Sequence, residues 1–317
     1  MKTKIFNLKQ IEAAAELIKN GELVAFPTET VYGLGGNALD PKAIKKIFYA
    51  KGRPKDNPLI IHIGKKEQLY EIAEIKDSQK KIVNRLISKF WPGPLTIILK
   101  KKKIIPNEVT AGLNTVAVRM PNNKIALNLI KYSGLPIAAP SANISGKPSA
   151  TCFIHVLDDF NGKIAGIIKS KDCKIGLEST VIDLTTKKPI LLRPGGITYE
   201  SLKKIIPNIQ IAKNKAKKVK SPGMKYKHYA PDAKVILFEK SAYDKINFFI
   251  EKFKKQNKKF LFLEPKKIKD FHKKMFKIFR DCDKKGIKYI LVSAVEEKGI
   301  NLALMNRLRK SASKIIK

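Results

Sequence analysis

The chain has 317 residues, enough for two domains, and a formal net charge of +38. Its hydrophobic content of 44% is ordinary for a globular protein and excludes a disordered chain. The charge would attract polyanions such as tRNA and nucleotides. Lysine is nevertheless frequent throughout the sequence, so charge alone does not identify a nucleic-acid binder.

The sequence carries no sign of a membrane segment, a disulfide framework or a metal centre. No apolar run reaches the roughly 18 residues of a membrane helix, and residues 1–10 lack the apolar core of a signal peptide. Cys152, Cys173 and Cys282 are few and show no ligand spacing. We therefore expect a cytoplasmic protein without membrane association and without metal-ligating side chains.

The first 200 residues alternate between helical and strand patterns. Asn7 and Gln10 form a capping pair for a first helix, and Asp40 before Pro41 predicts the start of a second one. Gly33 to Gly36 do not match a phosphate-binding fingerprint and are interpreted as a tight turn. Strands are predicted at 23–26, 59–63, 95–99, 115–119, 137–139, 164–168 and 179–184.

The pattern breaks after Ile206 and restarts after Pro231. The intervening segment is rich in lysine, contains no acidic residue up to position 231, and carries Met224, Tyr226, His228 and Tyr229. A spacer would not need those side chains, so we expect the segment to dock over a pocket. Beyond it, strand–helix units predict a small doubly wound α/β domain. The overall class is mixed α/β, with many strand ends delivering loops to one side.

Three short clusters at strand or helix ends are suited to binding phosphate. Lys51 and Arg53 flank a glycine where a helix ends, Ser141 and Asn143 follow an apolar run, and Arg193 precedes a glycine turn. No P-loop is present, so an ATP site here would depend on such cations, and arginine adds bidentate phosphate geometry. Each cluster alone is a weak signal; together, at successive strand ends, they are informative.

Several runs in order along the chain resemble the YrdC-like family. They are residues 26–34 (FPTETVYGL), 51–54 (KGRP), 91–96 (WPGPLT) and 140–143 (PSAN). The run at 221–231 (SPGMKYKHYAP) resembles the linker of the family's two-domain form, the threonylcarbamoyl-AMP synthases. The resemblance implies a YrdC-like catalytic domain at 1–206, a basic linker or lid at 207–231 and a Rossmann-like domain at 232–317. It also implies a twisted mixed sheet with a concave basic cleft.

The same resemblance implies an activity and a set of partners. L-threonine, bicarbonate and ATP would be joined into L-threonylcarbamoyladenylate and pyrophosphate, the first step of threonylcarbamoyladenosine formation next to the tRNA anticodon. Mg²⁺ would be bound mainly through the ATP phosphates. A tRNA threonylcarbamoyl-transferase complex would follow downstream, and weak binding of tRNA itself is a further expectation.

The resemblance also implies roles for individual residues, according to their positions in these motifs. The catalytic and nucleotide set is Lys51, Arg53, Ser141 and Asn143. Further ATP contacts fall on Asn57, Thr115, Ser149, Arg193, His228 and Tyr229. The threonine pocket falls on Thr30, His62, Arg119, Ala139 and Ser179, with Arg119 holding the amino-acid carboxylate.

Without the resemblance, ordinary structural roles would explain several of these residues. His62 would be a core histidine, Arg119 a surface charge, and Thr30 and Ser179 turn-forming hydroxyls. Two other functions also remain open, an RNA-binding module without catalysis and a regulatory relative that lost synthesis. A carbamoyltransferase is a third alternative, although the zinc-binding Cys-x-x-Cys modules of larger proteins with that activity are missing from this sequence.

Overall fold

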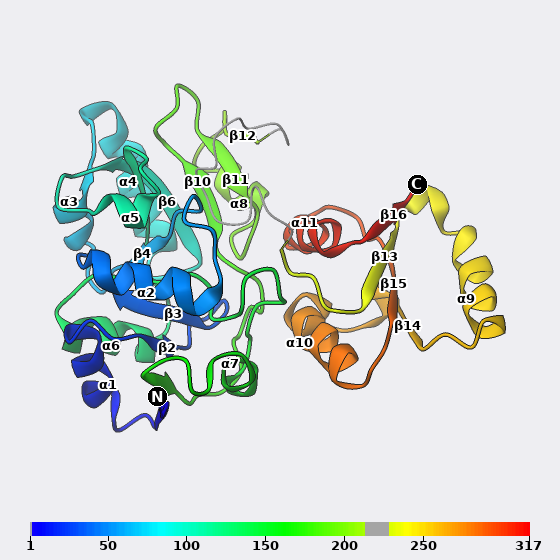
Figure 1. Cartoon of the computed structure of the whole chain (residues 1–317). Coiled ribbons are helices and arrows are strands. Elements are labelled where there is room, and N and C mark those ends of the chain that lie inside the picture. The colour runs from blue at the N-terminus through cyan, green and yellow to red at the C-terminus, as the bar shows by residue number, and fades with distance from the viewer. Residues whose placement is uncertain (1, 213–227) are drawn as a thin grey trace.

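The computed structural model describes residues 2–212 and 228–317 (Figure 1). Within these residues the chain folds into two α/β parts, each built on its own sheet. The larger sheet contains twelve strands. They are β1 Lys4–Phe6, β2 Val24–Phe26, β3 Gly33–Asn37, β4 Ile60–His62, β5 Ala73–Glu74, β6 Leu95–Lys101, β7 Thr115–Arg119, β8 Ile137–Ala138, β9 Gly166–Ile168, β10 Thr180–Asp183, β11 Ile190–Arg193 and β12 Gln210–Ile211.

The large sheet is mixed, with strand order β1-β9-β2-β3-β8-β4-β7-β6-β10-β11-β12 and with β5 paired to β6. At its centre, β4 runs parallel to β7 while β6 runs antiparallel to β7. The helices of this part are α1 Ile11–Lys19, α2 Pro41–Lys51, α3 Gln68–Ile72, α4 Asp77–Phe90, α5 Asn107–Thr110, α6 Lys124–Ser133, α7 Phe153–Phe160 and α8 Tyr199–Lys203. This arrangement confirms the mixed α/β class.

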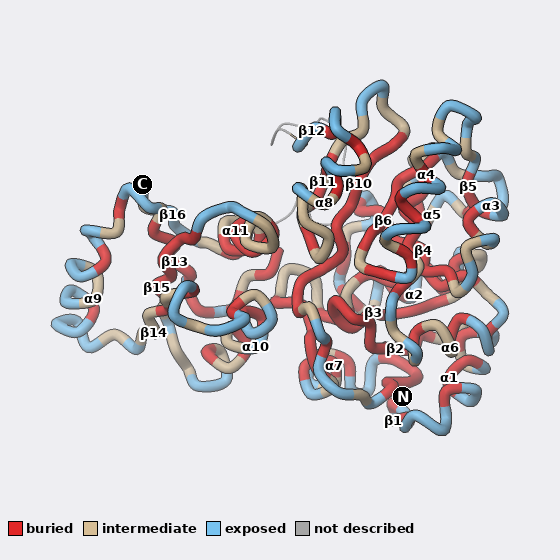
Figure 2. The backbone as a smooth tube through the Cα atoms, turned by 180° about the vertical axis from the view of Figure 1, so that it is seen from behind, coloured by how far each residue is buried: buried red, intermediate tan, exposed pale blue. Residues whose placement is uncertain are grey.

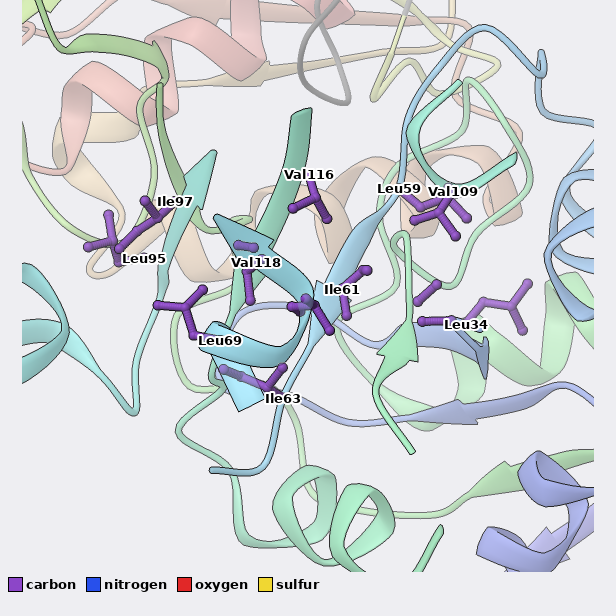
Figure 3. Close-up of a cluster of buried hydrophobic side chains, with 14 of the residues drawn as sticks. Leu34, Leu59, Ile61, Ile63, Leu69, Leu95, Ile97, Val109, Val116 and Val118 are labelled. Carbon is purple, nitrogen blue, oxygen red and sulfur yellow. The ribbon is translucent and has the colours of Figure 1, made fainter. Parts of the chain in front are cut away.

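Helices α2, α3 and α4 cover one face of the central strands and form the main core. Ile61 and Val118 of the sheet belong to the same buried cluster as Leu69 of α3 (Figure 3). The opposite face of the same strands carries only a small apolar cluster, of which Ile60, Ala117 and Val181 are members. Because side chains alternate along a strand, the residues that follow on this second face are His62 and Arg119. The less covered face of the sheet therefore leads directly to two predicted site residues.

The predicted start of α2 is confirmed. The Asp40 carboxylate accepts the backbone N–H of Lys42 at 2.8 Å, Pro41 occupies the first position of α2, and Gly52 closes that helix in the left-handed conformation. The Gln10 side chain accepts the backbone N–H of Asn7 at 3.0 Å, but α1 begins only at Ile11 and Gln10 at its N-cap makes no side-chain cap, so the capping role predicted for the pair is wrong. The Gly52 cap fixes the point at which the chain leaves α2, between Lys51 and Arg53.

The interpretation of Gly33 to Gly36 as a tight turn is wrong. These residues form strand β3, which pairs antiparallel with β2 and β8. A side chain at Gly35 would lie 2.7 Å from the ring of Phe26 and 2.9 Å from Ile137. The glycines are therefore explained by close packing against the neighbouring strands, which local sequence does not reveal.

The smaller part contains a four-stranded parallel sheet of order β14-β15-β13-β16. Helix α9 packs on one face of this sheet, and α10 and α11 pack on the other, which confirms the doubly wound prediction. The outer side of α9 is exposed (Figure 2). The elements are β13 Lys234–Phe238, α9 Lys245–Lys255, β14 Phe260–Leu263, α10 Phe271–Lys284, β15 Tyr289–Ser293, α11 Asn301–Ser311 and β16 Lys314–Ile316. Strand β16 was not predicted.

The two parts contact each other through α10 and α11. Arg280 of α10 donates to the carbonyl of Pro148 and forms an ion pair with Asp159 at 2.7 Å. A side chain at Gly176 would lie 2.6 Å from the α10 backbone at Lys273, so the two surfaces approach closely. Most of the predicted linker, residues 213–227, lies outside the described residues. Among the helices that the structure describes, none is long and apolar enough to cross a membrane.

Candidate functional site

A cavity lies at the ends of several strands of the large sheet. Some of these strands end at the cavity, and another begins there. His62 ends β4, Arg119 ends β7 and Arg193 ends β11, while Ser179 immediately precedes β10. Ten of the fifteen predicted site residues line this cavity. They are Thr30, Arg53, His62, Arg119, Ala139, Ser141, Ser179, Arg193, His228 and Tyr229. The expected convergence of residues from distant parts of the sequence is present.

Arg119 is held from three sides within the cavity wall. Its Nη1 donates to Thr30 Oγ1 at 2.9 Å, its Nε donates to the carbonyl of Gly93 at 3.3 Å, and its Nη2 lies 2.7 Å from Glu29 Oε1. The guanidinium is 5% exposed, so it is not the ordinary surface charge that local sequence suggests. A rigid arginine fork of this kind can hold a planar carboxylate.

His62 lies beside Arg119, because the two residues are register partners on parallel strands. Burial and the adjacent charge of Arg119 lower the pKa of His62 to about 3. The imidazole is therefore neutral at physiological pH and can offer hydrogen bonds without carrying charge. Its Nδ1 is buried and has no hydrogen-bond partner among the described residues.

Arg193 and Ser179 form the neighbouring wall. Arg193 donates from Nε to the Ser179 carbonyl and from Nη2 to Ser179 Oγ, both at 3.0 Å. Ser179 Oγ also lies 2.8 Å from Thr96 Oγ1. Arg193 is further hydrogen-bonded to the hydroxyl of Tyr229. This network fixes a second cation in the cavity wall.

Lys51 lies behind the cavity wall rather than in it. Its ammonium donates to the carbonyls of Ser141 and Asn143, so it holds the loop that presents Ser141 to the cavity. Burial, followed by the nearby charge of Arg53, lowers the pKa of Lys51 well below its ordinary value. The Asn143 side chain donates to the carbonyls of Ile144 and Lys147, while its buried Oδ1 has no described partner.

Arg53 does line the cavity, and it is anchored by the segment that follows it. Its Nε and Nη2 donate to the carbonyl of Asn57, and Nη2 also donates to that of Pro58. Burial lowers the pKa of Arg53 to about 10, which still leaves the guanidinium charged at neutral pH. Asn57 therefore reaches the site through its backbone, and its buried Oδ1 lacks a described partner.

Two predicted residues stand apart from the others. Ser149 reaches the cavity only through Glu178, whose Oε1 accepts its hydroxyl at 2.5 Å. Thr115 begins β7, four residues before Arg119, and is not among the lining residues. At about 3.3 Å per residue it lies roughly 13 Å along the strand from Arg119, on the same face. Its contact with ATP stays a prediction.

His228 and Tyr229 close one side of the cavity. Tyr229 is buried, adopts φ of 68° and packs its ring on Phe276 of α10 with centroids 5.5 Å apart. Burial, followed by the charge of Arg53, lowers the pKa of His228 to about 4. With both residues in this position the cavity has a volume of about 50 Å³. Sites for drug-sized ligands typically measure about 300–1,000 Å³, so a nucleotide would require a wider opening.

Three charged residues of the site were missed by sequence reasoning. Glu29 pairs with Arg119, Glu178 lines the cavity, and Arg307 of α11 forms a 2.9 Å ion pair with Glu178. Glu29 lies inside the recognised 26–34 run and Glu178 precedes a predicted residue, so both had a weak local signal. Arg307 had none, because its partner is 129 residues away.

The residues described do not form a metal site of their own. No group of three or more His, Cys, Asp or Glu side chains among them is placed to hold an ion. The carboxylates nearest the cavity, Glu29 and Glu178, are each paired with an arginine.

Comparisons with known proteins agree with this geometry over both parts of the chain. Residues 16–195 match the family model described as telomere recombination, and residues 197–313 match that of the threonylcarbamoyl-AMP synthase C-terminal domain. Two curated relatives are named threonylcarbamoyl-AMP synthase. The Pyrococcus abyssi protein is 50% identical over 97% of this chain and 96% of its own length, and the Bacillus subtilis protein is 42% identical over 96% and 94%.

A solved structure is similar over the whole molecule. The crystal structure of P. abyssi Sua5 complexed with L-threonine superposes with a TM-score of 0.94, at 48% identity, covering 99% of both chains. The fold of both parts is thus that of a known two-domain architecture. Together with the two matched models, this shows that the chain belongs to the two-domain YrdC-like family of threonylcarbamoyl-AMP synthases, which are nucleotidyltransferase-type enzymes.

Proposed function

We propose that this protein joins L-threonine, bicarbonate and ATP into L-threonylcarbamoyladenylate, with release of pyrophosphate. The observation that carries the proposal is a single cavity lined by three buried arginines. Arg119 is suited to binding a carboxylate, and Arg53 and Arg193 supply two further positive charges. The product would serve threonylcarbamoyladenosine formation next to the tRNA anticodon, after transfer to a tRNA threonylcarbamoyl-transferase complex. The reaction would take place in the cytoplasm.

The threonine end of the cavity is the side of Arg119. There the guanidinium would bind the substrate carboxylate, while Thr30 and Ser179 would offer hydroxyls and Ala139 apolar contact. The similarity to a structure complexed with L-threonine supports this assignment. Neutral His62 adds a hydrogen-bonding group without a second positive charge that would oppose the substrate amine.

The nucleotide end is the side of Arg53 and Arg193. Buried, pre-oriented cations stabilise charge that develops on a phosphate more effectively than solvated ones. Ser141 and Asn143 would contact the nucleotide, with Lys51 holding their loop in place. Magnesium would enter with the ATP phosphates. The RNA-binding alternative is less favoured, because Arg53 and Arg193 are buried rather than displayed on the surface, where a polynucleotide backbone would bind.

The chemistry needs alignment more than acid–base catalysis. The threonine amine attacks the bicarbonate carbon, a C–N bond forms and water leaves. A carbamate oxygen then attacks the α-phosphorus, and the bond to the β-phosphate oxygen breaks to release pyrophosphate. With pKa values of about 3 and 4, His62 and His228 are weak bases at neutral pH. The protein would contribute mainly by holding the nucleophile in line with a stabilised leaving group.

Substrate entry would require His228 and Tyr229 to move. His228 and Tyr229 line the cavity, and they belong to the predicted linker or lid at 207–231. Closure after binding would exclude water and protect the labile adenylate.

The proposal is tested by incubating purified protein with ATP, labelled bicarbonate and a panel of amino acids. We expect label to enter a threonine adenylate, with one pyrophosphate released for each product. ATP turnover that ignores threonine, or salt-sensitive RNA binding without any turnover, would contradict the proposal.

A further inference from the structure

A buried arginine from the smaller part of the chain reaches the wall of the cavity. Arg307 of α11 is 0% exposed, although arginine side chains are seldom fully buried. Its Nε forms the 2.9 Å contact with Glu178 Oε2, and its Nη1 donates to the carbonyl of Pro194 at 2.7 Å. Arg307 therefore links α11 to the residue before Ser179 and to the residue after Arg193.

Glu178 is the one acidic side chain among the lining residues that the structure describes. It is 6% exposed, and its two oxygens are used by Ser149 and Arg307. A carboxylate at this position is unexpected, because the proposed ligand is a polyanion. An unpaired negative charge here would repel the triphosphate at short range and in a medium of low dielectric constant.

The groups that face Glu178 decide its charge. Burial raises the pKa of Glu178, but the Arg307 and Arg193 guanidiniums and the Ser149 hydroxyl outweigh burial and hold that pKa below its ordinary value. Lys310 of α11, His228 and Tyr229 also lie within electrostatic range of the carboxylate. Glu178 is therefore ionised at neutral pH, and Arg307 carries the largest share of the opposing charge.

Arg307 also touches the segment that closes the cavity. Its guanidinium carbon lies 5.5 Å from the centre of the Tyr229 ring, and Tyr229 packs on Phe276 of α10 from another side. The contact places a cation over an aromatic face, which stabilises the ring in this orientation.

We propose that Arg307 is a positioning residue for nucleotide binding: it neutralises Glu178 inside the cavity and seats Tyr229 against it. The smaller part of the chain thereby contributes to the electrostatics of a site built on the larger sheet. This inference rests on the proposed function, since it concerns the ATP that the cavity would bind.

The test compares the KM for ATP, measured by pyrophosphate release in the full-length protein, between wild type and Arg307→Met. We expect the KM for ATP to rise on the order of tenfold, with a smaller change in the KM for threonine, because an unpaired carboxylate now faces the phosphates. In this variant the largest charge that opposes the Glu178 carboxylate is absent, while Arg193 and the Ser149 hydroxyl remain beside it.

A second substitution separates electrostatics from mere support of the fold. In the double variant Arg307→Met with Glu178→Gln, no charge faces the phosphates from this position, so the KM for ATP should return to within about threefold of wild type. Glu178→Gln alone should lower the KM for ATP, because Arg307 then adds unopposed positive charge. The matched control is Arg309→Met on the same helix, whose ion pairs with Glu239 and Glu297 lie within the smaller part.

The outcomes are distinguishable. If Arg307→Met behaves like Arg309→Met, or if Glu178→Gln fails to restore ATP binding in the double variant, the inference is overturned. If Arg307→Met does not fold, Glu178→Gln alone decides, and a raised KM for ATP in that variant overturns it. A wild-type protein that releases no threonine-dependent pyrophosphate refutes the proposed function instead; binding of ATP, followed calorimetrically in the same variants, then still tests the role of Arg307.

Discussion

At the scale of single residues, burial changes the chemistry of nearly every charged group in the site. Lys51, Arg53 and Arg193 all have lowered pKa values, first because burial disfavours the charged form. The groups stay in place because backbone carbonyls and hydroxyls accept their hydrogen bonds. Such pre-organised donors need little rearrangement when a phosphate binds.

Lys51→Ala should slow pyrophosphate release about a hundredfold or more. The substitution removes a charge near the nucleotide end and also frees the loop of Ser141 and Asn143, which Lys51 holds by two carbonyl contacts. The matched control is Lys45→Ala on the same helix, whose exposed ammonium lies 3.8 Å from Glu108. Turnover unchanged from wild type would remove Lys51 from the mechanism.

Three buried histidines should make the fold less stable as the pH falls below neutrality. Burial lowers the pKa of His62 to about 3 and of His155 and His228 to about 4, compared with about 6.5 in the unfolded chain. The unfolded state therefore binds more protons between these values, and the contribution to stability is present above about pH 6.5 and lost as the pH falls toward 4.

Within this window, each histidine should lower the free energy of unfolding by about 1.4 kcal/mol for every unit by which the pH falls. Denaturant unfolding at pH 7.5, 6.5 and 5.5 measures the slope. In His155→Gln, which leaves the cavity residues untouched, the slope should fall by roughly a third. A flat profile in the wild type would show that these imidazoles are not buried as neutral groups.

At the scale of elements, the site depends on close approach between backbone segments. Gly195 follows Arg193 of β11, and a side chain there would lie 2.4 Å from the backbone at Glu178, Ser179 and Thr180. That distance is far shorter than any non-bonded contact allows. The turn after β11 must therefore remain glycine for Arg193 and Ser179 to meet.

Gly195→Ala should displace the turn after β11 and reduce turnover strongly, with a loss of about 1–3 kcal/mol in stability. The matched control is Gly36→Ala in β3, where a side chain would meet side-chain atoms of Leu23, Ile47 and Ala43 at 3.1, 3.3 and 3.6 Å and no backbone atom closer than these. Thermal unfolding and pyrophosphate release are measured on both variants. Equal effects would mean that the backbone contact at Gly195 is not specific to the site.

At the scale of the whole molecule, buried arginines dock the two parts of the chain. Arg307 reaches Glu178, and Arg280 reaches both Pro148 and Asp159, whose Oδ2 also accepts the backbone N–H of Ile144. The Arg307 contact ends on Glu178, which lines the cavity, and Pro148 precedes Ser149, whose hydroxyl donates to Glu178. The relative position of the parts and the shape of the site are therefore linked.

Arg280→Met should lower the free energy of unfolding by about 3 kcal/mol, because it leaves Asp159 largely buried and unpaired. The matched control on the same helix is Lys284→Met, which breaks an ion pair with Asp158 whose side chains are 54% and 39% exposed. That loss should be below about 1 kcal/mol. Similar losses in the two variants would show that the Arg280 contact does not contribute to docking.

The sequence by itself determined the α/β class, the capped start of α2, most strand positions and the motif residues of the site. These features depend on local spacing, on caps and on short recognisable runs, which neighbouring residues encode. Ten of the fifteen predicted residues meet in one cavity, because the ends of neighbouring strands in the mixed sheet lie side by side.

Only the tertiary structure decided which glycines form a strand, where Thr115 lies relative to the cavity, and how charge is balanced around it. The fit of Gly35 depends on Phe26 and Ile137 from other strands. The charge of Glu178 depends on Arg307, far along the chain and in the other part of the molecule. A buried carboxylate or a glycine-rich strand is stable only beside neighbours that folding brings together. Its structural role therefore cannot be predicted from the residues adjacent to it in the sequence.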